Sequence, residues 1–298
     1  MFYVIEVLRT THQFKVFRSN LPDAHIGFVP TMGNLHEGHL SLIEESLENN
    51  DWTIVSIFVN PKQFGPNEDF ERYPRTLGKD VNLIKDLFQK KGFEKMGKKV
   101  AVFSPEKVSE IYPPDYSTTI SVGEELTGQL CGLSRPGHFD GVTTVVHQLF
   151  SVVKPNKVYF GQKDYQQYLI IKRMISDLNL DIQIIPMPIK RGSDGLALSS
   201  RNQFLSKEQK STALILPTTI DKMKRTIKSQ PWREAKNLLL KTVEEEYKKE
   251  MWDYLEVLDS TNLKTPGEDT HTVVIAGAIK IGETRLIDNK LVELNYAR

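Results

Sequence analysis

The stretch VPTMGNLHEGHLSL, residues 29–42, joins an apolar run to a segment with leucine and isoleucine at helical spacing. A strand that passes directly into a helix is the unit from which parallel sheets are built. Gly33 and Gly38 lie at this junction and allow a ligand to approach the backbone closely. His36 and His39 are three residues apart, so both face one side of the first helical turn. This stretch predicts an α/β fold with a ligand site at the strand–helix junction.

The chemistry of this junction suits a phosphate. The start of a helix offers unpaired N–H groups and a partial positive charge. Two imidazoles at that point can donate hydrogen bonds that strengthen as negative charge develops on phosphate oxygens. A single histidine near a helix cap is usually a plain surface residue, but the spacing His-x-Gly-His after a strand and a glycine turn favours a site. The sequence has neither a Gly-x-x-x-x-Gly-Lys-Ser/Thr loop nor a Gly-x-Gly-x-x-Gly fingerprint, which argues against a P-loop or dinucleotide enzyme.

Working outward, apolar β-branched runs alternate with amphipathic segments up to about residue 189. Strands are expected at residues 1–10, 26–29, 52–59, 100–103, 158–160 and 182–185. Helices are expected at residues 40–47, 80–91, 142–153 and 164–178. Alternation of this kind predicts a Rossmann-like, doubly wound parallel sheet with helices on both faces, in a domain of residues 1–189.

The pattern changes beyond residue 190. Two long helices are expected at residues 207–228 and 232–249, followed by strands at residues 254–258 and 273–280. Helices followed by strands without alternation predict a smaller α+β domain. We therefore expect a C-terminal domain of residues 190–298 that acts as a lid.

Composition narrows the class of protein. The 298 residues carry 39 Lys and Arg against 38 Asp and Glu, a net charge of +1, so no strongly basic balance indicates nucleic acid. Cys131 is the only cysteine and cannot close an intrachain disulfide, which fits a reducing compartment. No uncharged run approaches the roughly 18 residues of a membrane helix. We expect a cytoplasmic enzyme without nucleic-acid or membrane partners.

Two further segments suit a nucleotide. In YFGQKDYQQ, residues 159–167, Asp164 and Gln167 have the spacing of a helix capping box, which is as good an interpretation as a site. The functional interpretation uses Gly161 for close approach, Lys163 for phosphate and Asp164 for ribose hydroxyls.

The segment KRGSDGLALSSRN, residues 190–202, offers Ser199, Ser200 and Arg201 as donors to phosphate. A flexible linker is the alternative interpretation of this segment.

Together these segments resemble the pantothenate synthetase (pantoate–β-alanine ligase) family, within the His-x-Gly-His nucleotidyltransferase superfamily. The matching stretches occur in the family's order over most of residues 26–206. They are VPTMGNLHEGHLSLI, VSIFVNPKQFGPNEDFERYPRT, RPGHFDGVTTVV, FGQKDYQQ and GLALSSRNQFLS. Three positions depart from the family's usual pattern: Gln162 stands in place of glutamate, Leu198 in place of methionine, and Gly192 in place of an acidic residue.

The resemblance implies an activity and its reactants. The family condenses pantoate with β-alanine at the expense of ATP with Mg²⁺, and releases AMP and pyrophosphate through a pantoyl-adenylate intermediate. It implies no tightly bound organic cofactor, and it implies a homodimer.

The resemblance also implies site residues. ATP would be bound by Met32, Gly33, Asn34, Leu35, His36, Glu37, Gly38, His39, Gly161, Gln162, Lys163, Asp164, Lys190, Leu198, Ser199, Ser200 and Arg201. Catalysis would depend on His39 as proton donor, with His36, Lys163, Ser199, Ser200 and Arg201. Gln63 and Gln167 would bind pantoate, and Gln63 would also contact β-alanine. Asn60, Arg135 and His138 occupy further active-site positions, and the metal ligands stay open.

Two alternatives remain at this point. One is another His-x-Gly-His nucleotidyltransferase that keeps the nucleotide in its product, although it gives no reason for Gln63 and Gln167. The other is a nucleotide-binding module without turnover, suggested by the three departures.

Overall fold

The computed structural model describes residues 5–66 and 68–295, and the chain divides into two compact units. Unit 1 comprises Met1–Val122, Arg135–Gln162 and Ile170–Pro188. Unit 2 comprises Gly123–Ser134, Lys163–Leu169 and Ile189–Arg298.

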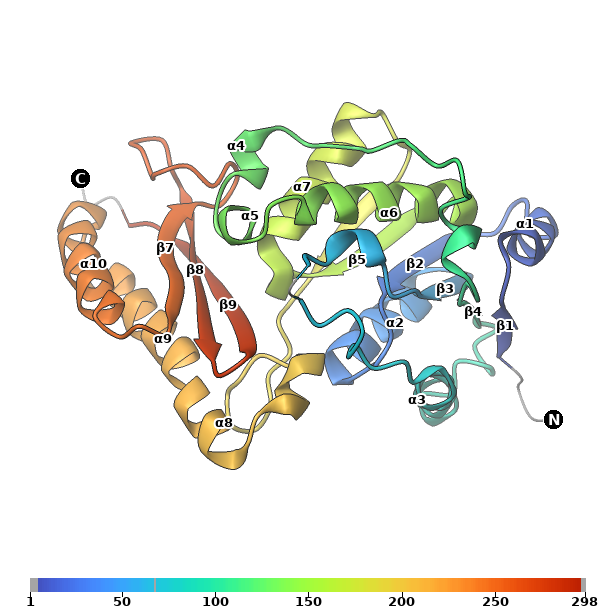
Figure 1. Ribbon diagram of the computed structural model, residues 1–298, viewed down its shortest axis with the longest axis horizontal. Coiled ribbons are helices and arrows are strands. Elements are labelled where there is room, and N and C mark those ends of the chain that lie inside the picture. The colour runs from blue at the N-terminus through green and yellow to red at the C-terminus, as the bar shows by residue number, and fades with distance from the viewer. Residues whose placement is uncertain (1–4, 67, 296–298) are drawn as a thin grey trace. The chain divides into compact units, whose positions relative to one another are not determined.

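Unit 1 is built on a six-stranded parallel sheet, shown in Figure 1. The strand order is β1-β4-β3-β2-β5-β6. The strands are β1 (Glu6–Leu8), β2 (Ile26–Thr31), β3 (Trp52–Ile57), β4 (Lys99–Phe103), β5 (Lys157–Gly161) and β6 (Gln183–Met187). Pro186 is tolerated in β6 because this strand lies at an edge of the sheet, where a missing N–H breaks no ladder on the open side.

Helices cover both faces of this sheet, as Figure 1 shows. On one face α2 (Glu37–Asn49) packs against β2, β3 and β5, and α3 (Leu77–Lys90) packs against α2. On the other face α6 (His138–Val153) packs against β2, with α1 (Thr11–Ser19) beside it. Because both faces are covered, β3 is buried along nearly its whole length, as its continuous apolar run predicts.

Unit 2 contains a three-stranded antiparallel sheet in the order β7-β8-β9. Its strands are β7 (Trp252–Asp259), β8 (Thr272–Ile281) and β9 (Thr284–Glu293). The helices are α4 (Glu124–Thr127), α5 (Cys131–Ser134), α8 (Lys207–Ala213), α9 (Ile215–Ser229) and α10 (Trp232–Tyr247). The helix α9 packs against β8, β9 and α10, and its buried side chains share one apolar core with both strands. The helix α7 (Tyr165–Asp177) begins in unit 2 and ends in unit 1.

The predicted fold class is confirmed: a doubly wound parallel sheet accompanies a smaller α+β part. The single helix expected at residues 207–228 is wrong, because α8 and α9 are separate and meet at Leu214. Pro217 explains the break, since it has no N–H to donate to the carbonyl of Ala213. Part of the strand expected at residues 1–10 falls on residues 1–4, outside the described residues.

The segments Gly123–Ser134 and Lys163–Leu169 belong to unit 2, although the expected boundary at 189 places them in the first domain. The buried side chain of Gln166 accounts for this, because it bonds the carbonyls of Leu126 and Gln129 and the N–H of Cys131 at 2.7–3.0 Å. Hydrogen bonds between segments this far apart in the chain cannot be predicted from the periodicity of apolar residues. The lid role of residues 190–298 stays a prediction.

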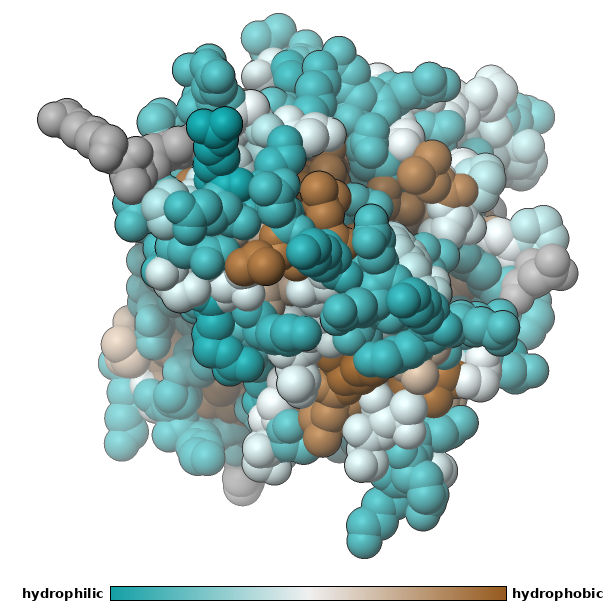
Figure 2. Space-filling model, turned by 90° about the vertical axis from the view of Figure 1, so that its left-hand side faces the viewer, coloured by the Kyte–Doolittle hydropathy of each residue, from teal (hydrophilic) through white to brown (hydrophobic). Residues whose placement is uncertain are grey.

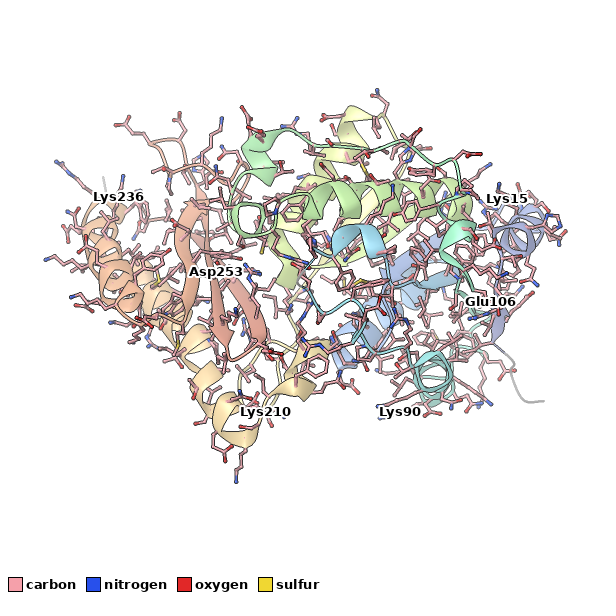
Figure 3. The ribbon with its side chains drawn as sticks, in the orientation of Figure 1. Lys15, Lys90, Glu106, Lys210, Lys236 and Asp253 are labelled. Atoms are coloured by element: carbon pink, nitrogen blue, oxygen red, sulfur yellow. The ribbon has the colours of Figure 1, made fainter. Side chains whose placement is uncertain are left out.

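Figure 2 shows hydrophobic residues in separate small groups among hydrophilic ones on the face it presents. Exposed lysines lie on several helices: Lys15, Lys90, Lys210 and Lys236, labelled in Figure 3, are on α1, α3, α8 and α10. None of the helices within residues 5–66 and 68–295 combines the length and apolar character needed to cross a bilayer.

Candidate active site

The strand order predicts a ligand site at one point of the unit 1 sheet. The chain builds β3 and β4 to one side of β2, and β5 and β6 to the other. The switch point therefore lies between the neighbouring strands β2 and β5, and ligands bind beyond the carboxyl ends of strands at such points. Residues 32–36 follow β2, and Gly161 ends β5. A Cβ at Gly161 would meet no atom within 4 Å, so the space beside it is open.

The loop after β2 has an uncommon backbone. Gly33 has φ +85° and Asn34 has φ +51°, both in the left-handed region. This turn directs the N–H groups of Asn34 and Leu35 at one carboxylate, that of Asp80 on α3, at 3.0 and 2.8 Å. Asp80 is 1% exposed and also accepts from Thr76 Oγ1. The loop is thus held by a buried carboxylate that lies 45 residues further along the chain.

The two histidines lie together at the start of α2. His36 is the N-cap, and its Nδ1 accepts a hydrogen bond from the Gly38 N–H at 3.1 Å. Because Nδ1 accepts, the proton of the neutral ring is on Nε2, which is then a donor. The rings of His36 and His39 stack with centroids 4.1 Å apart and an interplanar angle of 35°. The pair is partly buried, whereas Glu37 between them is exposed.

Gln63 ends the short 3₁₀ helix η1 (Pro61–Gln63), which Asn60 caps. Asn60 is 1% exposed, and its amide donates to Gln63 Oε1 and to the carbonyl of Gly141, both at 3.0 Å. Its own oxygen accepts from Tyr112 Oη at 2.9 Å. Since Gln63 Oε1 is held as an acceptor, Gln63 Nε2 is the atom that can donate to a ligand oxygen.

Gly141 makes this arrangement possible. A Cβ at that position would lie 2.1 Å from the carbonyl oxygen of Lys62, so only glycine lets η1 lie directly on α6.

Arg135 and His138 form a connected group with Glu68 and Gln63. Arg135 makes a two-pronged ion pair with Glu68, both contacts at 2.6 Å, and its Nη1 lies 2.9 Å from His138 Nε2. Arginine can only donate, so His138 Nε2 accepts, and Nδ1 carries the proton. That Nδ1 donates to the Gln63 carbonyl at 2.8 Å. The group therefore fixes the tautomer of His138 and the position of the Gln63 backbone.

The charge of Arg135 also affects Glu68. Burial by itself would raise the pKa of Glu68, but the hydrogen bonds and charge of Arg135, together with the Gly65 N–H, hold the pKa below its usual value. A carboxyl with a lowered pKa stabilises the fold above its unfolded pKa, about 4.3 for glutamate, and loses this contribution as the pH falls through the folded pKa.

We therefore predict that Glu68→Gln lowers the free energy of unfolding by about 1 kcal/mol near pH 7. The difference from the wild type should shrink as the pH drops below about 4.3, because the unfolded state then takes up a proton at Glu68, and it should vanish below the folded pKa, where Glu68 is protonated in both states. Urea denaturation of both proteins between acid and neutral pH measures it. A difference that stays constant with pH would contradict the ion pair as its cause.

In unit 2, Lys163, Asp164 and Gln167 lie where η3 (Gln162–Asp164) passes into α7. Lys163 Nζ is 3.8 Å from Asp164 Oδ2, and Asp164 immediately precedes α7, which is compatible with either interpretation of that residue. Gln166 is buried as a structural residue, whereas Gln167 is only partly buried. Of the two adjacent glutamines, Gln167 is the one accessible to a ligand.

Residues 190–198 form a small hairpin rather than a flexible linker. Arg191 and Ala197 form an antiparallel bridge, and Leu198 N–H donates to the Lys190 carbonyl at 2.9 Å. A Cβ at Gly192 would lie 2.7 Å from Asp194 Oδ1. The glycine that replaces the family's acidic residue at 192 therefore leaves room for the carboxylate of Asp194.

After the hairpin, Ser199 caps η4 (Ser200–Phe204) by accepting from the Arg201 N–H at 3.2 Å. Ser200 and Arg201 thus begin a helical turn at the end of an ordered segment. For Gln162 and Leu198, nothing in the structure explains the departures.

Two residues of this arrangement escape the sequence patterns. Asp80 has only the signal of an acidic residue near a helix start, and Glu68 has only a place in a polar stretch. Among the described residues, no group of three or more His, Cys, Asp or Glu side chains forms a candidate metal centre.

Comparison with known proteins identifies the family of this chain. The model of the family described as pantoate-beta-alanine ligase matches residues 6–291. A pantothenate synthetase from Acetivibrio thermocellus is 48% identical over 271 residues, which cover 90% of this chain and 92% of the relative. One from Thermotoga petrophila is 42% identical over 292 residues, covering 97% and 100%.

Solved structures agree as well. The pantothenate synthetase of Thermus thermophilus superposes with a TM-score of 0.85 at 37% identity, covering 96% of this chain and 99% of that one. The pantoate-beta-alanine ligase of Francisella tularensis, complexed with beta-gamma ATP and beta-alanine, gives a TM-score of 0.69 at 33% identity, covering 97% and 98%. The chain belongs to the pantoate–beta-alanine ligase family.

Proposed function

We propose that this protein condenses pantoate with β-alanine to give pantothenate, using ATP and releasing AMP and pyrophosphate through pantoyl-adenylate. The observation that carries the proposal is the stacked pair His36 and His39 at the start of α2, beside the switch point of the sheet. Family membership favours this reaction over a transferase that keeps the nucleotide in its product.

In the first step a pantoate carboxylate oxygen bonds to the α-phosphorus of ATP, and the bond to the bridging oxygen of pyrophosphate breaks. No protein nucleophile is needed, so the protein aligns the reactants and stabilises charge. His36 and His39 donate hydrogen bonds to the phosphates, with His39 as the proton donor. The Asn34 and Leu35 turn is fixed beforehand by Asp80, so the donors need no rearrangement during the reaction.

Gln63 is proposed to bind a pantoate oxygen through Nε2, the amide atom that Asn60 does not engage. The Asn60, Arg135 and His138 contacts keep this amide and its backbone in place. In the second step the amine of β-alanine, also contacted by Gln63, bonds to the acyl carbon, loses a proton and displaces AMP.

The remaining proposed ATP-binding residues of unit 1 are Met32, Gly33, Glu37, Gly38, Gly161 and Gln162. Those of unit 2 are Lys163, Asp164, Lys190, Leu198, Ser199, Ser200 and Arg201. Lys163 and Arg201 would neutralise phosphate charge. The Lys163 ammonium would act as a point charge, and the planar Arg201 guanidinium would donate two hydrogen bonds at once. Mg²⁺ is proposed to arrive with ATP as the counterion of its phosphates, because that is how nucleotides commonly carry it.

The proposal is tested by product formation in purified protein. AMP release is expected only when ATP, pantoate and β-alanine are all supplied. AMP release that does not depend on any carboxylate would reject it, and ATP binding without AMP formation with any acid would favour a binding module. A product whose mass includes the nucleotide would favour the transferase alternative.

Gln167 separates a binding role from a capping role. We predict that Gln167→Ala raises the KM for pantoate about tenfold, because one hydrogen bond to a buried substrate oxygen is lost. Steady-state kinetics with ATP saturating measure it. An unchanged KM with a lowered melting temperature would assign Gln167 to the cap of α7 instead.

A homodimer and a cytoplasmic location, both expected from the sequence, stay predictions. Light scattering of the purified protein tests the first.

A further inference from the structure

Strand β9 carries two adjacent polar residues that are almost completely buried, Asp288 at 2% and Asn289 at 4% exposure. Successive residues of a strand point to opposite faces of the sheet, so the two side chains reach different surroundings. Buried polar groups are retained where they have partners, and each has one in a different segment of unit 2.

On one face, Asp288 holds the hairpin of residues 190–198. Its carboxylate accepts from Arg191 Nη1 at 2.6 Å and Nη2 at 2.8 Å, a two-pronged pair. Arg191 Nη1 also donates to the Gly195 carbonyl at 3.2 Å, across the turn of the hairpin. This fixes the segment that begins with Lys190 and continues into Ser199.

On the other face, Asn289 holds the segment that precedes α7. Its Nδ2 donates to the Lys163 carbonyl at 2.9 Å. A small hollow in unit 2 is lined by residues of both segments and of β9, among them Lys163, Ser199 and Asp288. The two segments therefore converge beside β9.

We propose that Asp288 and Asn289 are positioning residues. They fix the segment around Lys163 and residues 190–201, the two proposed phosphate-binding segments, relative to each other. The inference rests on the proposed function, which assigns Lys163 and residues 190–201 to ATP. Core packing does not account for the pair, because apolar residues such as Leu286 and Val292 serve that purpose elsewhere in β9. Two neighbouring buried polar residues instead give directed contacts to the backbone of one segment and the hairpin of the other.

Asn289→Asp tests the Lys163 contact, because the carboxylate has nearly the same size but cannot donate to a carbonyl. We expect kcat/KM for ATP to fall about 10- to 100-fold, as for other residues that orient a binding group, while the KM for pantoate is unchanged. Lys290→Met is the matched control. Lys290 is the next residue of β9 and pairs with Asp221 on α9 rather than with either segment. It should leave kcat/KM for ATP unchanged.

Arg191→Lys tests the other face, because lysine keeps the charge but not the two-pronged geometry. We expect faster hydrogen exchange at the Gly192 and Leu198 amides, whose hydrogen bonds close the hairpin. We also expect a higher Kd for ATP, measured by calorimetry without pantoate.

These binding and exchange measurements do not require turnover. If the wild type forms no AMP, the proposed function fails, and the Kd and exchange rates still decide the inference. The inference would be overturned if Asn289→Asp and Arg191→Lys both kept the wild-type Kd for ATP and the wild-type rates of amide hydrogen exchange. If Asn289→Asp does not fold, Arg191→Lys alone carries the same decision.

Discussion

Replacing His39 by alanine is expected to lower kcat by about 10²- to 10³-fold, the usual loss when one preorganised donor to a transition state is removed. Pantoate binding should be unchanged, because the histidine contacts charge that develops on phosphate. His39 stacks on His36 at 4.1 Å, so both imidazoles are held before the substrate arrives. Single-turnover formation of AMP, with the Kd of pantoate measured separately, distinguishes the two quantities.

The control for this variant is His12→Ala, an exposed histidine on α1 in the same unit. It should leave kcat unchanged. An unaltered kcat in His39→Ala would remove His39 from the mechanism, and an equal fall in pantoate affinity would make it a general binding residue.

Asp80→Ala is expected to reduce both stability and activity. The change leaves the N–H groups of Asn34 and Leu35 without their acceptor, and each such loss costs about 1–3 kcal/mol. We expect the free energy of unfolding to fall by about 2–4 kcal/mol in urea denaturation. A displacement of the loop by about 1 Å is enough to lower kcat/KM for ATP by about 10²-fold.

Asp86→Ala, at an exposed position of the same helix, is the matched control and should change neither quantity. If Asp80→Ala unfolds as readily as predicted but keeps wild-type kcat/KM at a temperature where it is folded, Asp80 supports α3 alone and has no part in placing the loop.

The parallel sheet could be predicted because local signals decide it. Continuous apolar runs such as β3 indicate strands covered on both faces, and the glycine turn at Gly33 indicates a strand–helix junction. The break at Leu214 was also visible in principle, because Pro217 lies inside the predicted helix.

Contacts between distant segments could not be predicted in the same way. Asp80, Glu68 and Asn289 act on residues 45, 67 and 126 positions away, and no periodicity records such pairs. Gln166 shows the same limit, since it resembles its neighbour Gln167 in sequence but is buried among the carbonyls of α4 and the following turn. The motifs identify groups that can meet the substrates, whereas their supports depend on the tertiary fold.

The most direct measurement of the central claim is mass spectrometry of the enzyme's products when β-alanine is withheld. With ATP and pantoate alone, pantoyl-adenylate and pyrophosphate should accumulate, and added β-alanine should convert the adenylate to pantothenate and AMP. A nucleotide-bearing product that persists after β-alanine is added, or the absence of any adenylate from an active preparation, would contradict it.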